Sequence, residues 1–255
     1  MLDSTQRFSN RVDHYIRYRP RYPSEILTTL RRDCQLSSQS LIVDVGSGTG
    51  FLSELFLSNG NAVVGVEPNA EMRLAGEYYL SQFGNFQSIA GQAEAIPLKD
   101  SYADFVVAGQ AFHWFDPVLT RREFSRVLAP EGWVVLIWND RETRSSQFLQ
   151  AYEQLLQRYA VDYVQVKHQY VGTPLLHQFF GHSSIELTTL QNRQDFDFEG
   201  LKGRSLSSSY TPAPEHPSYE PMMAELLEIF QTFAVDGTVR FEYTTRLYYA
   251  RFAAE

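Results

Sequence analysis

Short apolar runs alternate with amphipathic stretches through the first 140 residues of the chain. Five runs of apolar and β-branched residues have the length of buried strands and are bounded by turn residues, at 41–45, 61–67, 86–90, 104–112 and 133–139. Four other segments repeat their apolar residues at helical spacing, at 24–32, 51–59, 69–83 and 118–128. Strands that alternate with helices in this way predict βαβ units and a parallel sheet.

The pattern changes after residue 140. Two alternating segments, 185–196 and 239–252, predict further strands, which brings the expected total to seven. Helices are expected over 146–159 and 221–233 and a short one over 198–206, whereas 160–184 has no clean period. The predicted fold is therefore α/β and Rossmann-like: a doubly wound, mostly parallel seven-stranded sheet with an N-terminal and a C-terminal cap.

The first 23 residues are rich in arginine and aromatic residues and contain Pro20 and Pro23. They can be an exposed basic leader or a segment that folds over a pocket. We favour the second interpretation, because exposed aromatic rings are costly and the prolines fix an extended turn. Tyr15, Arg19 and Tyr22 are the candidate residues for a lid or for substrate contact.

Three glycines follow the first predicted strand at alternate positions, in the sequence VDVGSGTG, and a helix comes next. Such a turn lets a ligand approach the backbone and points helix N-terminal N–H groups at it. A dinucleotide fingerprint requires a third glycine where this chain has Phe51. Glu67 lies 17 residues beyond Gly50, where its carboxylate can accept both hydroxyls of a ribose. The pattern favours a nucleoside over a pyrophosphate.

The amino-acid composition argues against several classes of protein and of binding site. The single cysteine, Cys34, excludes an internal disulfide framework and a cysteine-based zinc site, and the scattered histidines do not favour another metal site. The net charge of −8 argues against a general nucleic-acid binder. No stretch approaches 18 consecutive apolar residues and no signal peptide is recognised, so we expect a cytoplasmic protein without a membrane partner, as a monomer or homodimer.

Five motifs carry a resemblance to a known family. They are VDVGSGTG, GVEP, GQAEAIP, DFVVAGQAFHWF and VLAPEGWVVL, and they span about 100 residues in order. The chain resembles the class I S-adenosylmethionine-dependent methyltransferases in all five. The leader RYRPRYP is similar to that of a small-molecule branch that includes the trans-aconitate methyltransferases.

The resemblance implies that S-adenosylmethionine is the cofactor and that the following residues bind it: Asp44, Gly46, Ser47, Gly48, Gly50, Glu67, Pro68, Met72, Gln92, Ala93, Glu94, Gln110, Ala111 and Trp114. Asp44 would orient the glycine turn or meet the methionine amino group through water. Glu67 would hold the ribose hydroxyls, residues 92–94 would flank the adenine, and Gln110 would line the methionine portion. Gln92 and Glu131 depart from the family pattern, which has Asp and Gly at these places.

Other roles are open for several of these residues. Asp44 can simply brace the loop, Glu67 can be an exposed charge at a helix start, and Gln110 can bond to the backbone. His113, after the fourth strand, is a candidate general base with a pKa near working pH. It can equally pack against adenine or satisfy a hydrogen bond in the core.

The expected function is methyl transfer from S-adenosylmethionine to a small-molecule acceptor by in-line displacement. A non-catalytic S-adenosylmethionine-binding module is one alternative, and an NAD-dependent oxidoreductase is a less favoured one because of Phe51. We expect one domain over 1–255, with a lid at 1–23, a cofactor-binding core at 24–140, and the remaining strands and a substrate cap at 141–255.

Overall fold

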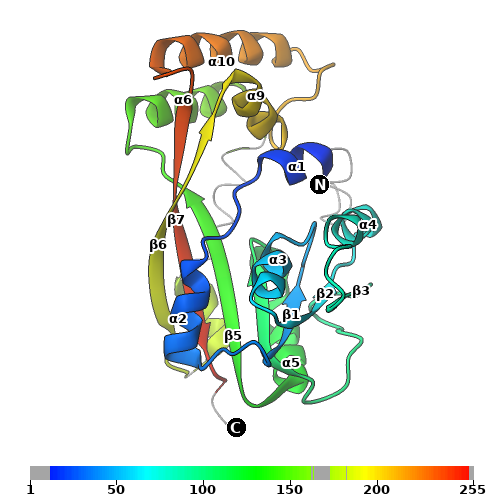
Figure 1. The fold of residues 1–255 in the computed structure, drawn as a ribbon. Helices are drawn as coiled ribbons and strands as arrows, with labels where there is room; N and C mark the ends of the chain where they lie inside the picture. Colours follow the sequence, from blue (N-terminus) through cyan, green and yellow to red (C-terminus); the bar gives the residue numbers. More distant parts are fainter. Residues whose placement is uncertain (1–11, 162, 164–172, 182, 253–255) are drawn as a thin grey trace.

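The computed structural model describes residues 12–161, 163, 173–181 and 183–252, which form a seven-stranded sheet with helices on both faces (Figure 1). The strand order is β3-β2-β1-β4-β5-β7-β6. The first five strands in this order are parallel, and β7 is antiparallel to both β5 and β6. The strands are β1 (Leu41–Val45), β2 (Ala62–Val66), β3 (Phe86–Ile89), β4 (Ala103–Gly109), β5 (Leu128–Arg141), β6 (Glu186–Phe196) and β7 (Val239–Ala250). The predicted fold class is confirmed.

The described helices are α1 (Val12–Tyr18), α2 (Glu25–Cys34), α3 (Phe51–Ser58), α4 (Ala70–Tyr79), α5 (Pro117–Val127), α6 (Gln147–Tyr159), α8 (Thr173–Phe180), α9 (Phe198–Leu206), α10 (Tyr219–Phe233) and a 3₁₀ turn η2 (Phe112–Trp114). The order of the parallel strands reverses between β1 and β4. In open α/β sheets, ligands bind outside the carboxyl ends of the strands at such a point.

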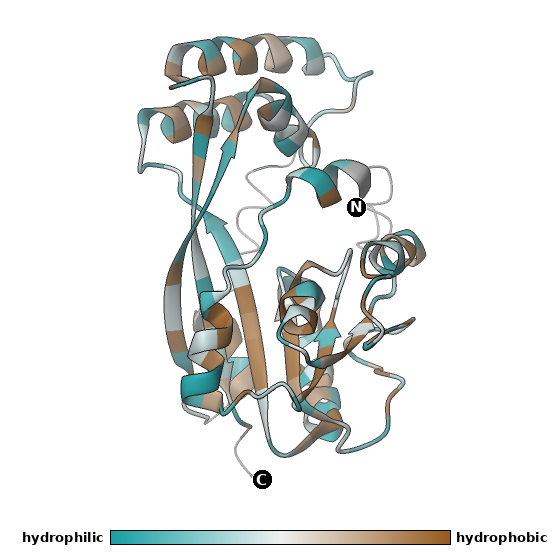
Figure 2. Ribbon diagram, in the orientation of Figure 1, coloured by the Kyte–Doolittle hydropathy of each residue, from teal (hydrophilic) through white to brown (hydrophobic). Residues whose placement is uncertain are grey.

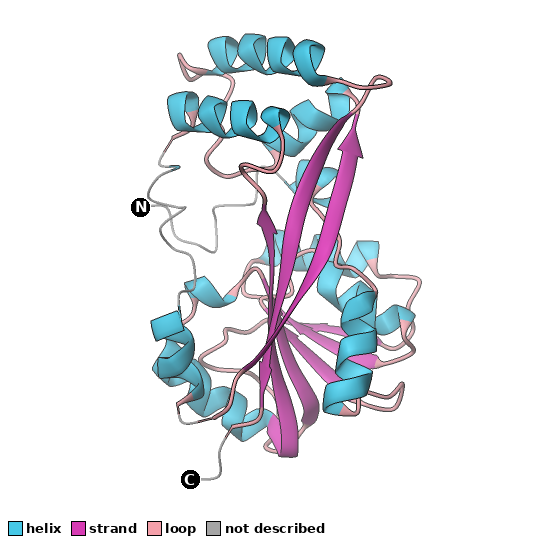
Figure 3. Ribbon diagram, turned by 90° about the vertical axis from the view of Figure 1, so that its left-hand side faces the viewer, coloured by secondary structure: helices cyan, strands magenta, loops and turns pink. Residues whose placement is uncertain are grey.

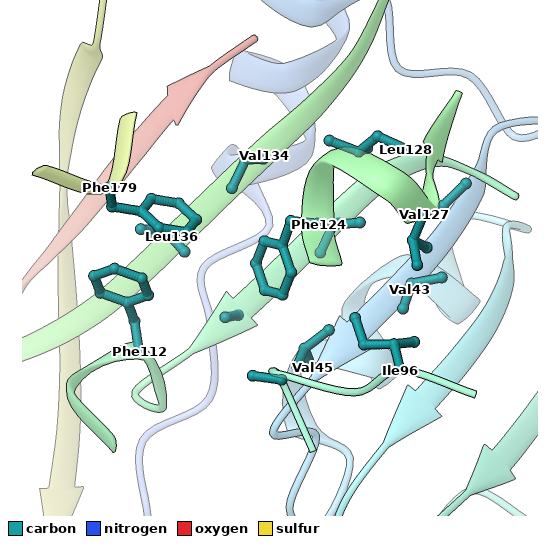
Figure 4. Close-up of a cluster of buried hydrophobic side chains, with 14 of the residues drawn as sticks. Val43, Val45, Ile96, Phe112, Phe124, Val127, Leu128, Val134, Leu136 and Phe179 are labelled. Atoms are coloured by element: carbon teal, nitrogen blue, oxygen red, sulfur yellow. The ribbon is translucent and has the colours of Figure 1, made fainter. Parts of the chain in front are cut away.

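Successive side chains of the central strands point to opposite faces of the sheet, and they form two separate hydrophobic clusters. On one face, Val134 and Leu136 of β5 belong to a cluster with residues of α5 and α8, such as Phe124 and Phe179 (Figure 4). On the other face, alternate residues such as Val135 pack with α2 and α3. The hydropathy colouring follows this layering, with hydrophobic residues concentrated along the central strands (Figure 2). Both faces of the sheet are therefore buried, as the near-continuous apolar runs predicted.

A third cluster lies where β6 and β7 extend beyond the parallel strands and carry α6, α9 and α10 (Figures 1 and 3). We call α6, α9, α10 and residues 207–218 the cap. Phe241 is fully buried there, with ring centroids of Phe148, Tyr152 and Phe196 at 5.3, 5.0 and 5.6 Å. The cap is thus built on two strands that also belong to the main sheet.

Two local predictions need correction. The pattern places the start of the fifth strand at Trp133, but β5 begins at Leu128, which pairs with Ala103. The helix predicted over 24–32 begins one residue later, at Glu25, and the side chain of Ser24 does not cap it. The backbone of Ser24 is helical, at φ −62° and ψ −21°, whereas a capping side chain needs an extended backbone.

Cys34 is buried, and burial raises the pKa of its thiol to about 12, which agrees with a passive residue. In the described part of the chain, no helix combines the length and the apolar character needed to cross a membrane.

Candidate active site

The loop of residues 46–50, here called the glycine loop, connects β1 to α3 at the carboxyl edge of the sheet. The N–H groups of Gly46 and Ser47 donate to the carbonyl of Val66 at 2.8 and 3.2 Å, which ties the loop to the end of β2. Gly46 has a φ of +70°, and a Cβ there would lie 2.6 Å from the Cβ of Ala111. Both the left-handed backbone and the close approach of the segment after β4 therefore require glycine.

Glu67, at the end of β2, joins the glycine loop to the start of α4. Its Oε2 accepts a hydrogen bond from the N–H of Gly48 at 2.9 Å, and its Oε1 accepts one from the N–H of Asn69 at 2.8 Å. Burial raises the pKa of Glu67, although these two N–H groups and Arg73 act in the opposite direction. Each carboxylate oxygen has a second lone pair, so Glu67 can accept two further donors.

Asp44 is a buried carboxylate behind the glycine loop. It is fully buried, and its Oδ2 accepts a hydrogen bond from the hydroxyl of Ser53 at 2.7 Å. Its Oδ1 is buried and accepts no hydrogen bond from the described residues. Burial raises the pKa of Asp44 to about 7, with a further contribution from the charge of Glu67. Asp44 is therefore a proton acceptor or an ion-pair partner with a pKa near neutrality.

A cavity of about 250 Å³ lies beside the glycine loop, at the carboxyl ends of β4 and β5. Its walls come from the glycine loop, the two strand ends, the residues before α2 and the cap. Six aromatic side chains line it: Tyr22, Phe51, Trp114, Trp138, Tyr163 and Tyr210. The cavity thus combines an aromatic wall with the buried carboxylate of Asp44.

The residues between α1 and α2 pass over this cavity. A Cβ at Gly109, the last residue of β4, would overlap the hydroxyl of Tyr22, so Tyr22 lies directly on the strand end. The guanidinium of Arg21 lies 3.6 Å from the ring centroid of Phe51, beside the glycine loop. At the other side, a Cβ at Gly203 of α9 would overlap the ring of Tyr18. The leader therefore contacts both the sheet and the cap.

Comparison with known proteins finds similarity to methyltransferases. Residues 43–136 match the methyltransferase domain family. An uncharacterized methyltransferase of Schizosaccharomyces pombe is 29% identical over 236 residues, which cover 88% of this chain and 87% of that protein. In this domain and in this relative, the chain is similar to methyltransferases.

Other similar proteins are also described as methyltransferases. An uncharacterized methyltransferase of Mycobacterium tuberculosis is 37% identical over 142 residues, and the match covers 56% of each protein, so it spans about half of that relative. Among solved structures, a proposed type II methyltransferase from Anaeromyxobacter dehalogenans has a TM-score of 0.71 at 18% identity, covering 93% of this chain and all of that one. At this identity the structural likeness shows the fold alone.

The fold brings seven of the fifteen predicted cofactor and catalytic residues to the cavity. Those that line it are Asp44, Gly46, Ser47, Gly48, Gln110, His113 and Trp114, together with the lid residues Arg19 and Tyr22. Gln110 has a φ of +56°, and its side chain donates to the carbonyl of Asn139 at 3.1 Å. The rings of His113 and Trp114 are 4.8 Å apart. The side chain of Tyr15 lies outside the described part of the chain.

The remaining predicted residues do not line this cavity: Gly50, Glu67, Pro68, Met72, Gln92, Ala93, Glu94 and Ala111. Several of them lie beyond the glycine loop, at the ends of β2 and β3. Pro68 and Gln92 are exposed there, and Ala93 is buried. The carboxylate of Glu94 accepts the N–H of Asp116 at 2.8 Å and so holds the start of α5.

Sequence reasoning missed several cavity residues that the structure brings together. Asn139, Asp140 and Arg141 end β5, and the rule that ligands bind at the carboxyl ends of parallel strands could have found them. Arg204 and Tyr210 come from α9 and the loop after it. That segment has no local signal for a binding site, because only the packing of the cap brings it to the sheet.

The raised pKa of Asp44 gives a testable pH dependence. The folded state binds the Asp44 proton more tightly than the unfolded state, so its contribution to stability is lost as pH rises from about 4 through about 7. Between pH 5 and pH 8, the wild type should lose roughly 2–3 kcal/mol more stability than Asp44→Asn, measured by urea unfolding without cofactor. Asp236→Asn, in an exposed turn, should follow the wild type. Parallel pH profiles for the wild type and Asp44→Asn would contradict the assignment.

Proposed function

We propose that the protein transfers a methyl group from S-adenosylmethionine to a small-molecule acceptor that binds in the cavity. The observation that carries this proposal is that one cavity of about 250 Å³ is lined both by the glycine loop and by the cap, with the leader across it. A space of this size suits a small molecule. An enclosed site also excludes water, which competes with the acceptor.

The residues at the glycine loop fit the cofactor. The buried Oδ1 of Asp44 accepts no hydrogen bond from the described residues and can meet the methionine ammonium group, directly or through water. Glu67 can accept the two ribose hydroxyls with its remaining lone pairs. Residues 92–94 lie at the end of the next strand, where the adenine would lie, and Gln110, which lines the cavity, would contact the methionine portion.

When bound, the cofactor would supply a methyl group attached to a sulfonium sulfur. The positive charge on this sulfur already makes it a good leaving group. The protein then has to align the acceptor atom with the methyl–sulfur bond, and positioning of this kind can lower a barrier by roughly 7–11 kcal/mol. The rings of Tyr22 and Trp114 can stabilise a nearby cation by about 0.5–2 kcal/mol. His113 lines the same wall and is the proposed base for an acceptor that must lose a proton.

Calorimetric titration of the wild type with S-adenosylhomocysteine tests the cofactor assignment, and NADH in a parallel titration should give no heat. Transfer of labelled methyl groups from S-adenosylmethionine to a panel of small acids, amines and alcohols tests the acceptor class. Binding of S-adenosylhomocysteine without product across the panel would favour a non-catalytic module. NADH binding with no binding of S-adenosylhomocysteine would reject the proposal.

A further inference from the structure

One part of the cavity lining is rich in arginine. Arg19 of the leader, Arg141 at the end of β5 and Arg204 of α9 all line it, together with Tyr163 and Tyr210. We call these five residues the arginine end. They come from four separate parts of the chain.

Arg204 is a buried cation whose hydrogen bonds go to neutral groups. Its side chain donates to the hydroxyl oxygens of Tyr243 and Ser208, at 3.2 and 3.1 Å, and the residue is 5% exposed. It forms no ion pair with any described residue. An arginine keeps its charge even when buried, so a guanidinium without a counter-ion is costly. The ring of Phe241, 5.8 Å away, limits how far this side chain can turn.

Arg141 has only part of its hydrogen-bonding capacity in use. Its Nη2 donates to the carboxylate of Glu153 at 2.5 Å and to the hydroxyl of Tyr163 at 3.0 Å. Its Nη1 is buried and donates to no described residue, and the side chain is 10% exposed. Its guanidinium lies 5.1 Å from the ring centroid of Tyr152, which fixes its position.

Among the described residues, the carboxylate at the arginine end does not balance the charge of Arg141 and Arg204. Glu153 pairs with Arg141, and Arg204 donates to hydroxyl oxygens, so these two guanidiniums and one carboxylate leave an excess of one positive charge. Asp140, on the neighbouring wall, is neutralised by Arg246 at 3.1 Å. The local field is therefore positive at a buried site that an acceptor can reach.

Tyr210 responds to this field. Burial alone raises the pKa of its hydroxyl, but the guanidiniums of Arg204, Arg141 and Arg19 lower it by more, so the net shift is downward. Its ring packs edge to face on Tyr163, with centroids 4.8 Å apart. The hydroxyl of Tyr210 therefore lies where a negative charge is stabilised.

We propose that the arginine end binds an anionic group of the methyl acceptor, a carboxylate or a phosphate, through Arg141, Arg204 and the hydroxyl of Tyr210. Planar guanidiniums bind both groups with paired hydrogen bonds. The acceptor is then a small acid whose anionic group lies at the cap, away from the atom that reacts beside the glycine loop. This inference rests on the proposed function, since it names the acceptor of that same site.

Calorimetry on the complex with S-adenosylhomocysteine provides the test, with inorganic phosphate, succinate and the neutral succinamide as probes. We expect saturable binding of phosphate or succinate and none of succinamide, and the two anions separate the phosphate source from the carboxylate source. Arg204→Gln should weaken anion binding about 10–100-fold and change the affinity for S-adenosylhomocysteine by less than twofold. Arg204→Lys keeps the charge and should bind the anion with intermediate affinity.

Arg158→Gln is the matched control, because Arg158 is an exposed cap residue outside the cavity, and it should bind both anions like the wild type. Thermal unfolding establishes that each variant is folded. The inference is wrong if the loaded wild type binds neither anion, if succinamide binds equally well, or if Arg158→Gln loses as much affinity as Arg204→Gln. Failure of S-adenosylhomocysteine itself to bind would instead reject the proposed function.

Discussion

Replacing Glu67 with alanine is expected to weaken binding of S-adenosylhomocysteine by about 100-fold, or about 3 kcal/mol. A hydrogen bond to a charged group contributes about 1.5–3 kcal/mol, and the proposed role of Glu67 gives it two such bonds to the ribose. The substitution also removes the acceptor of the N–H groups of Gly48 and Asn69, so the glycine loop loses its connection to α4. Calorimetric titration of the folded variant measures the effect.

Glu71→Ala is the control for this experiment. Glu71 lies four residues further on, exposed in the first turn of α4, and makes no contact with the glycine loop in the described hydrogen bonds. It should bind S-adenosylhomocysteine like the wild type. Glu67→Gln keeps the size of the side chain but loses its charge, and we expect an intermediate affinity. Undiminished binding by Glu67→Ala would remove Glu67 from the cofactor site.

Replacing Phe241 with alanine is expected to lower the free energy of unfolding by about 3–5 kcal/mol, as is usual when a large buried ring is removed. Phe241 lies in the cap cluster, where its neighbours are Phe148 and Tyr152 of α6 and Phe196 at the end of β6. Because one helix and one strand hold these neighbours in place, they cannot all move inward to fill the cavity. Urea unfolding followed by tryptophan fluorescence and by circular dichroism measures the loss.

The same experiment tests the prediction that residues 1–255 form one domain. Because β6 and β7 run from the sheet into the cap, both probes should report a single transition at the same urea concentration. Tyr78→Ala is the control, since it removes an aromatic ring that is 85% exposed, and it should change stability by less than about 0.5 kcal/mol. Two separated transitions would show that the cap unfolds independently.

Much of the sheet could be predicted because its signals are local. The apolar runs, their turn residues and the helical spacing between them follow from backbone geometry and burial, and they placed all seven strands. The errors concern element ends, such as Leu128 and Ser24, where pairing with a neighbour or the local backbone angle decides.

The candidate site was predicted unevenly for a related reason. Residues next to the glycine loop or at strand ends, such as Asp44 and Gln110, have a fixed place in a βαβ unit, and they line the cavity. Arg204 and Tyr210 have no such place, because α9 reaches the cavity only when the cap packs on β6 and β7. Their chemistry becomes visible only in three dimensions.

The sequence by itself determined the strand and helix pattern, the glycine loop and the spacing of Glu67, because each depends on neighbouring residues and on conformations that only certain side chains allow. Only the tertiary structure decided that Tyr22 lies on Gly109, that the leader joins the sheet to the cap, and that three arginines meet around Tyr210. Those contacts join residues far apart in the chain, and long-range packing, which no local pattern encodes, brings them together.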